Sequence, residues 1–231
     1  RLFASAPTPV HGVWHAAGAL ADAVLQKQDA SGLAFVYAPK AHGAWSLHGA
    51  TAQGGVRAFA FFSSVAALLG GAGQANYAAA NTCLDALATT RRARGATATS
   101  VQWGAWAEVG MASRGAAGVR LAAMAAAAGF GLIGLAQGMA ALSTATRHGA
   151  QPVLSLVPIV WSRYLGGTTS VPAFLSGFTP ARKVLSSASM KNAVKTAAAK
   201  VTLDDVLEMV KRTAGGAVDA DAPLMESGVD S

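Results

Sequence analysis

One stretch of the chain, residues 61–87, constrains the fold more than any other. It reads FFSSVAALLGGAGQANYAAANTCLDAL. The apolar run that leads into it, Val56–Phe62, is short and rich in aromatic residues, which predicts a buried strand. Ser63 and Ser64 follow this strand, and a glycine-rich loop then leads to an alanine-rich helix that we expect to begin near Asn76. A hydroxyl at the carboxyl end of a strand lies where open α/β sheets bind their ligands.

The predicted helix carries a second polar group toward the same place. Tyr77 and Asn81 are four residues apart, so they share one helix face. Each residue also has an ordinary explanation when it is taken singly. Ser64 could cap a turn, Tyr77 could be a half-buried helix residue, and Lys40, in the segment YAPKAHGAWSLH, could be a solvated surface charge.

The whole stretch resembles the ketoreductase domain of modular polyketide synthases, a branch of the short-chain dehydrogenase/reductase superfamily. The family pattern is approximately FSSxAxxxGxxGQxNYAAANxxLDALA, and this chain matches it nearly throughout. The intervals from Lys40 to Ser64 and from Ser64 to Tyr77 also fit the family. The resemblance implies a catalytic set of Lys40, Ser64, Tyr77 and Asn81. It also implies an α/β fold with a doubly wound, Rossmann-like parallel sheet.

The residue types suit the reduction of a ketone, which needs a hydride on carbon and a proton on the developing alkoxide. The resemblance implies that NADPH supplies the hydride. A phenol with a pKa of roughly 10 is a poor acid at neutral pH, and we expect the Lys40 cation to lower the pKa of Tyr77. Ser64 can donate a hydrogen bond to the ketone oxygen. Asn81 can position Lys40 or a water molecule.

Further segments resemble the family's cofactor-binding regions. Val10–Trp14 predicts a short buried strand, and the HAAG segment after it resembles the one beside the cofactor's adenosine end. GAWAEVGMAS resembles the segment that passes the nicotinamide. No GxGxxG-type phosphate loop precedes the HAAG segment, so we expect the N-terminal part of the nucleotide fold to be missing and the chain alone to be inactive. The cofactor-binding residues implied by the resemblance are His15, Ala16, Ala17, Gly18, Ser63, Gly110 and Met111.

Three positions carry the family's markers of stereochemistry. Asp22 matches the last aspartate of the LDD motif that marks B-type reduction, although Ala21 departs from that motif. Leu69 occupies the position of the A-type tryptophan, and Ala79 that of a proline associated with epimerisation. The resemblance therefore implies B-type reduction without epimerisation. The alternative is that Asp22 simply begins a helix.

Other segments complete the predicted domain. Leu33–Thr51 predicts a helix that bears Lys40 and is interrupted at Pro39. Thr97–Trp103 predicts a strand, and Pro152–Trp161 resembles the last strand of the family. The Tyr77 helix ends in cations that suit its C-terminal dipole. These cations are Arg91, Arg92 and Arg94.

The chain divides by composition into a ketoreductase portion (1–165), a linker rich in small residues (166–200) and an acidic C-terminal unit (201–231). In the last unit Thr202 is a plausible helix N-cap and apolar residues follow at helical spacing. This unit resembles the first helix and long loop of an acyl carrier protein, in which the serine of an Asp-Ser pair bears 4′-phosphopantetheine. Asp230-Ser231 matches that pair, and ordinary loop sequence is the alternative.

Charge and composition limit the other function classes. The net charge is +7, but no basic run with interleaved aromatic residues predicts nucleic-acid binding. The single cysteine, Cys83, excludes a disulfide framework within the chain and fits a reducing, cytoplasmic compartment, and no signal peptide opens the chain. Residues 121–146 are uncharged, but their alanines and glycines favour helices outside a membrane over a membrane span.

The sequence thus predicts part of a polyketide synthase that reduces a β-ketoacyl thioester to a β-hydroxyacyl thioester with NADPH. Its partners would be the acyl carrier domain with its tethered substrate and the other synthase domains, without nucleic acid or membrane. One alternative is the equivalent region of a type I fatty acid synthase. Another is a ketoreductase fold that is not catalytic and serves as a scaffold.

Overall fold

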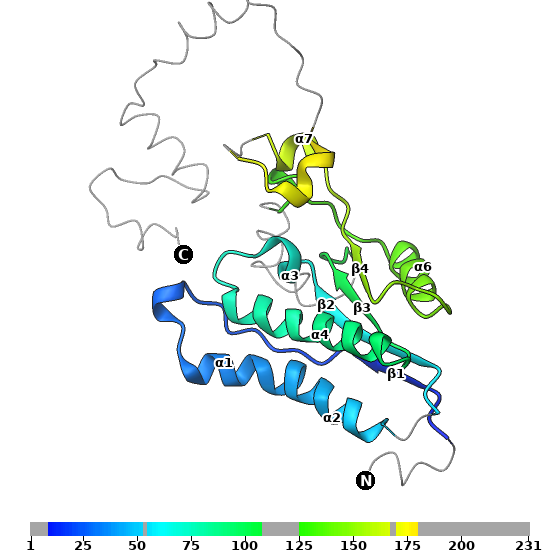
Figure 1. Cartoon of the computed structure of the whole chain (residues 1–231). Helices are drawn as coiled ribbons and strands as arrows, with labels where there is room; N and C mark the ends of the chain where they lie inside the picture. The colour runs from blue at the N-terminus through cyan, green and yellow to red at the C-terminus, as the bar shows by residue number, and fades with distance from the viewer. Residues whose placement is uncertain (1–8, 53–54, 108–124, 167–169, 180–231) are drawn as a thin grey trace, which may run out of the picture. The chain divides into compact units, whose positions relative to one another are not determined.

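Four parallel strands form one sheet in the computed structural model, which describes residues 9–52, 55–107, 125–166 and 170–179 (Figure 1). The strands lie in sequence order, and every neighbouring pair is parallel. Their bounds are β1 Gly12–His15, β2 Ala58–Ser64, β3 Thr99–Trp103 and β4 Val153–Leu156. The predicted α/β fold with a Rossmann-like parallel sheet is confirmed.

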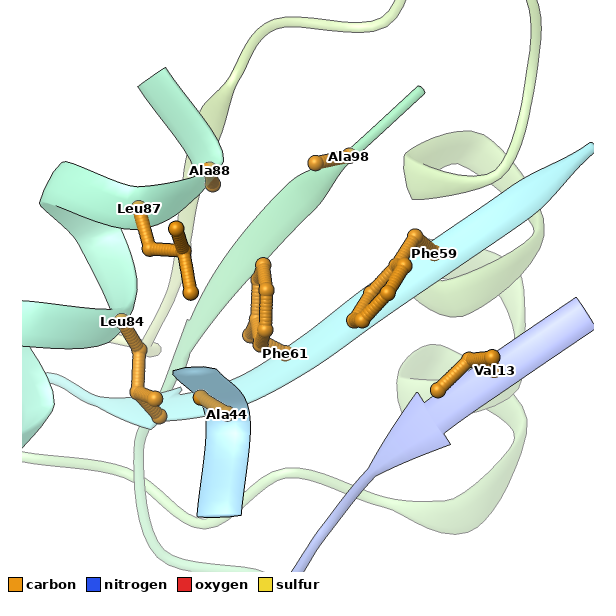
Figure 2. Close-up of a cluster of buried hydrophobic side chains, with 8 residues drawn as sticks. All are labelled: Val13, Ala44, Phe59, Phe61, Leu84, Leu87, Ala88 and Ala98. Atoms are coloured by element: carbon orange, nitrogen blue, oxygen red, sulfur yellow. The ribbon is translucent and has the colours of Figure 1, made fainter. Parts of the chain in front are cut away.

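Helix α4 (Ala75–Ala93) covers one face of this sheet and begins where the sequence predicted it. Its Leu84 and Leu87 pack against the aromatic rings of Phe59 and Phe61 from β2 (Figure 2). All four side chains are buried, and each contributes roughly 1.5–3 kcal/mol through removal from water. This apolar contact fixes the position of α4 over β2.

The segment that bears Lys40 is helical with a local widening. Helix α1 (Ala30–Tyr37) continues through a π-helical turn, η2 (Ala38–His42), into α2 (Gly43–Ala50). The N–H of Gly43 bonds to the carbonyl of Ala38, five residues earlier, and Pro39 lies in this turn. Single π-helical turns occur often at functional sites, and Lys40 lies within this one.

The opposite face of the sheet packs against α6 (Leu135–Ala145) and the segment around Ile133. Val101 and Trp103 of β3 are buried there. The ring of Trp106 lies directly against Gly138 of α6, where a Cβ atom would clash with it. The remaining elements are η1 (Leu25–Lys27), α3 (Ala66–Leu69), α7 (Trp161–Tyr164) and η4 (Ala173–Phe178). The last predicted strand, 152–161, is therefore shorter than expected and gives way to a helix at Trp161.

By its internal contacts the chain divides into two units, Arg1–Pro180 and Ala181–Ser231. The predicted linker and carrier helix fall mostly in the second unit, which lies outside the described residues, so the predicted boundaries at 165 and 200 stay predictions. Among the described helices, none combines the length and the apolar character that crossing a bilayer requires.

Candidate active site at the carboxyl end of the second strand

Three elements bring the predicted catalytic residues together. Ser64 ends β2, Tyr77 lies in the first turn of α4, and Asn81 follows one turn later. Lys40 reaches the same place from the π-helical turn η2. Its Nζ donates to the carbonyl of Phe62 at 3.0 Å and lies 5.2 Å from the centroid of the Tyr77 ring. The structure thus gathers residues that are far apart in the sequence.

Lys40 is buried, with 3% of its side chain exposed. Burial lowers the pKa of Lys40 to about 8, and the carboxylate of Asp85 acts in the opposite direction. An ordinary lysine would titrate near 10.5. The Lys40 ammonium is therefore charged at neutral pH but close to the pH range in which it loses its proton.

The Tyr77 phenol is also buried, and burial raises the pKa of Tyr77. The polar side chains of Asn81 and Ser64 lower it, and the Asp22 carboxylate raises it slightly further. The net direction is opposite to the lowering expected from Lys40, because loss of hydration outweighs the favourable polar contacts. Tyr77 therefore carries its proton at neutral pH, as a proton donor must.

The two serines that end β2 have different hydrogen-bond partners. The Oγ of Ser64 accepts from the N–H of Ala66 at 3.2 Å, which leaves its own proton free for another acceptor. Ser63 is buried, and its Oγ donates to the carbonyl of Asn81 at 3.3 Å. Ser63 thereby ties the end of β2 to α4, and its predicted contact with a cofactor stays a prediction.

Among the described residues, only one of the two polar atoms of the Asn81 side chain makes a hydrogen bond. Its Nδ2 donates to the carbonyl of Tyr77 at 2.8 Å, which fixes the direction of the amide. Its Oδ1 is buried and has no hydrogen-bond partner among the described residues. Buried polar atoms are nearly always paired, so this oxygen marks a place for a water molecule or a cationic group. The expected role of Asn81 in holding Lys40 or a water stays a prediction.

The HAAG segment borders the site at the end of β1. The Nε2 of His15 donates to the carbonyl of Lys40 at 3.0 Å, and burial lowers the pKa of His15. A Cβ atom on Gly18 would lie 3.1 Å from Cε of Lys40, so a larger residue would crowd the lysine. Ala16 and Ala17 are exposed and small, which leaves room beside the sheet edge. His15 acts in this structure as a support for Lys40.

The stereochemical markers lie around the start of α4. The Oδ2 of Asp22 accepts from Nε2 of Gln74 at 2.9 Å, and the carbonyl of Ala21 accepts from Nδ2 of Asn76 at 2.8 Å. No helix begins at Asp22, so the helix-start alternative is wrong. Leu69 and Ala79 are both half-buried, in α3 and α4. Gly110, Met111 and Ser231 lie outside the described residues.

Sequence reasoning missed one buried acid. Asp85 follows Asn81 by one helical turn, and its carboxylate accepts hydrogen bonds from Ser100 at 2.6 Å and Gln102 at 2.8 Å. The signal was present in the sequence, because Tyr77, Asn81 and Asp85 recur every fourth residue in an otherwise alanine-rich helix. It could not be interpreted without knowing which strand faces the helix.

An open parallel sheet with a lysine, a serine and a tyrosine at the carboxyl end of its strands defines a Rossmann-type domain of the short-chain dehydrogenase/reductase class. Comparison with known families identifies a particular family within this class. Residues 2–108 match the family described as KR domain. The chain contains a ketoreductase domain of the modular polyketide synthase type, and such domains are oxidoreductases that use NADPH.

Individual relatives agree with this assignment. The chain is 34% identical to the phthioceranic/hydroxyphthioceranic acid synthase of Mycobacterium tuberculosis (strain ATCC 25618 / H37Rv), over 100% of this chain and 11% of that protein. It is 38% identical to polyketide synthase GfsB of Streptomyces halstedii, over 91% of this chain and 4% of that protein. The chain therefore spans only a small part of the curated relatives it matches.

Solved structures show the same fold. An A-type ketoreductase from a modular polyketide synthase superposes with a TM-score of 0.69 at 34% identity, over 78% of this chain and 38% of that chain. A C2-type ketoreductase superposes with a TM-score of 0.65 at 36% identity, over 75% of this chain and 37% of that chain. Ketoreductases described as A-type and as C2-type thus share this fold.

Proposed function

We propose that the polypeptide carrying this chain reduces a β-ketoacyl thioester to the β-hydroxyacyl thioester. The observation that carries the proposal is the convergence of Lys40, Ser64, Tyr77 and Asn81 at the carboxyl end of β2. NADPH, when bound, supplies the hydride. Everything else in the reaction is positioning and proton transfer by side chains of this chain.

Each side chain has a role that its surroundings support. Tyr77 donates its proton to the oxygen of the former ketone, which takes up the negative charge. Ser64 donates a hydrogen bond to that same oxygen before and during the reaction. The Lys40 ammonium stabilises the phenolate that Tyr77 becomes, because an opposite charge close by favours the ionised form. The free Oδ1 of Asn81 holds the water through which Tyr77 regains its proton.

The residues at the end of β1 fit a nucleotide cofactor. Ala16, Ala17 and Gly18 present a small, exposed surface at the carboxyl edge of the sheet, where open α/β folds bind dinucleotides. These three residues, with His15 and Ser63 beneath them, would hold NADPH. Gly110 and Met111 would complete the contacts on the nicotinamide side.

The substrate is proposed to arrive on an acyl carrier protein. Residues 201–231 would begin such a carrier domain behind the linker 166–200, and Ser231 would bear 4′-phosphopantetheine. The other domains of a polyketide synthase would be further partners. A type I fatty acid synthase would use the same chemistry, but the similarity to polyketide synthase GfsB favours a polyketide synthase.

We further propose B-type reduction without epimerisation. The hydrogen bond between Asp22 and Gln74 fixes the segment beside the first turn of α4, where an entering substrate would pass. A tenfold preference between two substrate poses needs only about 1.4 kcal/mol. Chiral chromatography of the product from a diketide thioester should give the D-configured β-hydroxyl with the α-carbon unchanged. A predominantly L-configured alcohol would refute this assignment.

The decisive variant for the reaction is Tyr77→Phe in the polyketide synthase polypeptide that carries this chain. It removes the proton donor and keeps the ring, so kcat for a diketide thioester should fall by roughly 10²–10⁴-fold, with little change in NADPH affinity. Tyr164→Phe is the matched control, because the ring of Tyr164 packs against Phe130 and Trp161. A Tyr77→Phe rate above half that of the wild type would mean that another group is the acid. A wild-type protein without any ketone reduction would favour the scaffold alternative.

A further inference from the structure

The side of β3 that faces α4 is polar where a hydrophobic core would be expected. Ser100 and Gln102, two residues apart on β3, both point to α4 and are buried. They donate to the two oxygens of Asp85, whose side chain is 9% exposed. Ser155 of β4 lies opposite Gln102 in the sheet and donates to its Oε1 at 2.5 Å. The carboxylate is thus held by two donors of β3, and one of these, Gln102, is held in turn by Ser155 of β4.

The register of the sheet places this carboxylate over the strand next to the one whose carbonyl binds the Lys40 ammonium. Nζ of Lys40 donates to the carbonyl of Phe62 in β2. Phe62 pairs with Val101, the residue between Ser100 and Gln102 in β3. Ammonium and carboxylate therefore lie over neighbouring strands at the same level of the sheet. The Asp85 carboxylate raises the pKa of Lys40, opposing the effect of burial.

We propose that Asp85 is a positioning residue that serves as the buried counter-charge of Lys40 and keeps its ammonium ionised and in place. The catalytic consequence rests on the proposed function, whereas the electrostatic pairing does not. Burying an ammonium removes its hydration, and a carboxylate nearby restores part of the lost stabilisation. Ser100 and Gln102 hold the Asp85 carboxylate in position by donating to its two oxygens.

Few other charges face Lys40 from the elements packed against it. His15 lies at the end of β1, and burial lowers the pKa of His15, so it is neutral at neutral pH. Tyr77 of α4 is protonated there, because burial raises the pKa of Tyr77. β2 offers the Phe62 carbonyl, which carries no net charge. Asp85 is therefore the acidic residue of α4 whose negative charge stabilises the Lys40 ammonium.

The competing explanation is that Asp85 only joins α4 to β3. In that case its loss would lower stability but would not change the titration of Lys40. Ser100→Ala provides the matched comparison, because it removes one of the same hydrogen bonds and keeps the carboxylate. The two explanations therefore predict different effects of Asp85 on the titration of Lys40. A change in melting temperature would not distinguish them.

The first experiment needs no activity. The 231-residue chain is labelled with ¹³C at aspartate carboxyl carbons, and the Asp85 resonance is followed by NMR as the pH is raised. Titration of Lys40 nearby should produce a shift with its midpoint at about 8. This step should be absent in Lys40→Met, which keeps Asp85 and removes the titrating amine. An Asp85 resonance without such a step, or with the same step in Lys40→Met, would overturn the pairing.

The second experiment tests the consequence for catalysis in the polyketide synthase polypeptide. Loss of the Lys40 charge should make the reduction rate fall as the pH rises through about 8 in the wild type. Asp85→Asn should move this fall about one pH unit lower, and Ser100→Ala should leave it in place. The positioning role is refuted if Asp85→Asn and the wild type lose activity at the same pH. If Asp85→Asn does not fold, the NMR titration of wild type and Lys40→Met decides the pairing alone. A wild type that reduces no ketone would overturn the proposed function and leave the NMR result standing.

Discussion

Two buried cations, Lys40 and Arg91, lie at opposite ends of the sheet and show two uses of a buried charge. Both are almost fully buried, at 3% and 4% exposed. Among the described residues, the Lys40 side chain makes one hydrogen bond, from Nζ to the carbonyl of Phe62 at the carboxyl end of β2. Arg91 lies in the last turn of α4 at the amino end of the strands, where its guanidinium covers the Phe59 ring at 4.2 Å.

The surroundings of Arg91 indicate a structural role. It donates to the carbonyl of Thr97, to Nδ1 of His48 and to the hydroxyl of Thr51. A guanidinium stays protonated at any ordinary pH, and its fixed fork suits several acceptors at once. Lys40 instead has a compact charge whose pKa burial brings to about 8. The comparison indicates that Arg91 joins α4 to α2, to β2 and to the segment before β3, whereas the charge of Lys40 fits the catalytic role proposed for it.

The largest expected effect comes from breaking the reactive side of this comparison. Lys40→Met replaces the ammonium by an apolar chain of similar length, so the rate of ketone reduction should fall roughly 10²–10³-fold. The thermal midpoint should change little, because removing an ammonium that burial penalises offsets the loss of its attraction to Asp85, whose carboxylate keeps its hydrogen bonds from Ser100 and Gln102. Kinetics and thermal unfolding of the same preparation test both parts. A large drop in the midpoint would mean that Lys40 is structural like Arg91.

Arg91→Met should instead cause a large loss of stability. It removes the contact with Phe59 and leaves three acceptors without their donor, which should cost about 3 kcal/mol in the free energy of unfolding. The matched control is Arg92→Met, because Arg92 is half-buried and bonds to the Ala150 carbonyl. Its cost should stay below about 1 kcal/mol. Denaturant unfolding measures the difference, and equal costs for the two arginines would contradict the role given to Arg91.

The smallest effect is a pH dependence around Arg91. Burial, Arg91 and Arg94 all lower the pKa of His48, so its Nδ1 is an unprotonated acceptor in the folded protein. The unfolded chain binds the proton more tightly, and therefore stability is complete above pH 6.5 and is lost as the pH falls through the folded-state pKa. His48→Asn keeps an acceptor that does not titrate in this range. Its thermal midpoint should fall less than that of the wild type between pH 7 and pH 5, and parallel declines would exclude His48 as the cause.

Local patterns in the sequence, together with the family resemblance, were enough to predict the fold, and the catalytic set that they indicated stays a prediction. The aromatic strand, the serines at its end and the helix from Ala75 lie within one continuous stretch, so their relation depends on short-range rules. β2 was predicted at 56–62 and observed at 58–64, a small shift because strand ends depend on the partner strand. Lys40 entered through the family's spacing, and the structure places it beside Tyr77.

Tertiary structure decided what the individual charges do. Arg91 was expected to be one of three cations at a helix end, yet the strand it faces buries it against Phe59. Tyr77 was expected to have a lowered pKa, yet burial dominates. Asp85 shares the four-residue spacing of Tyr77 and Asn81, but this spacing does not predict its hydrogen-bond partners. The register of β3 places Ser100 and Gln102 opposite it. The sequence by itself determined which groups lie on which face of each element, because helix and strand periods are local. Which of those groups lose their water, and which charges then face one another, depends on contacts between distant segments, and only the tertiary structure decides that.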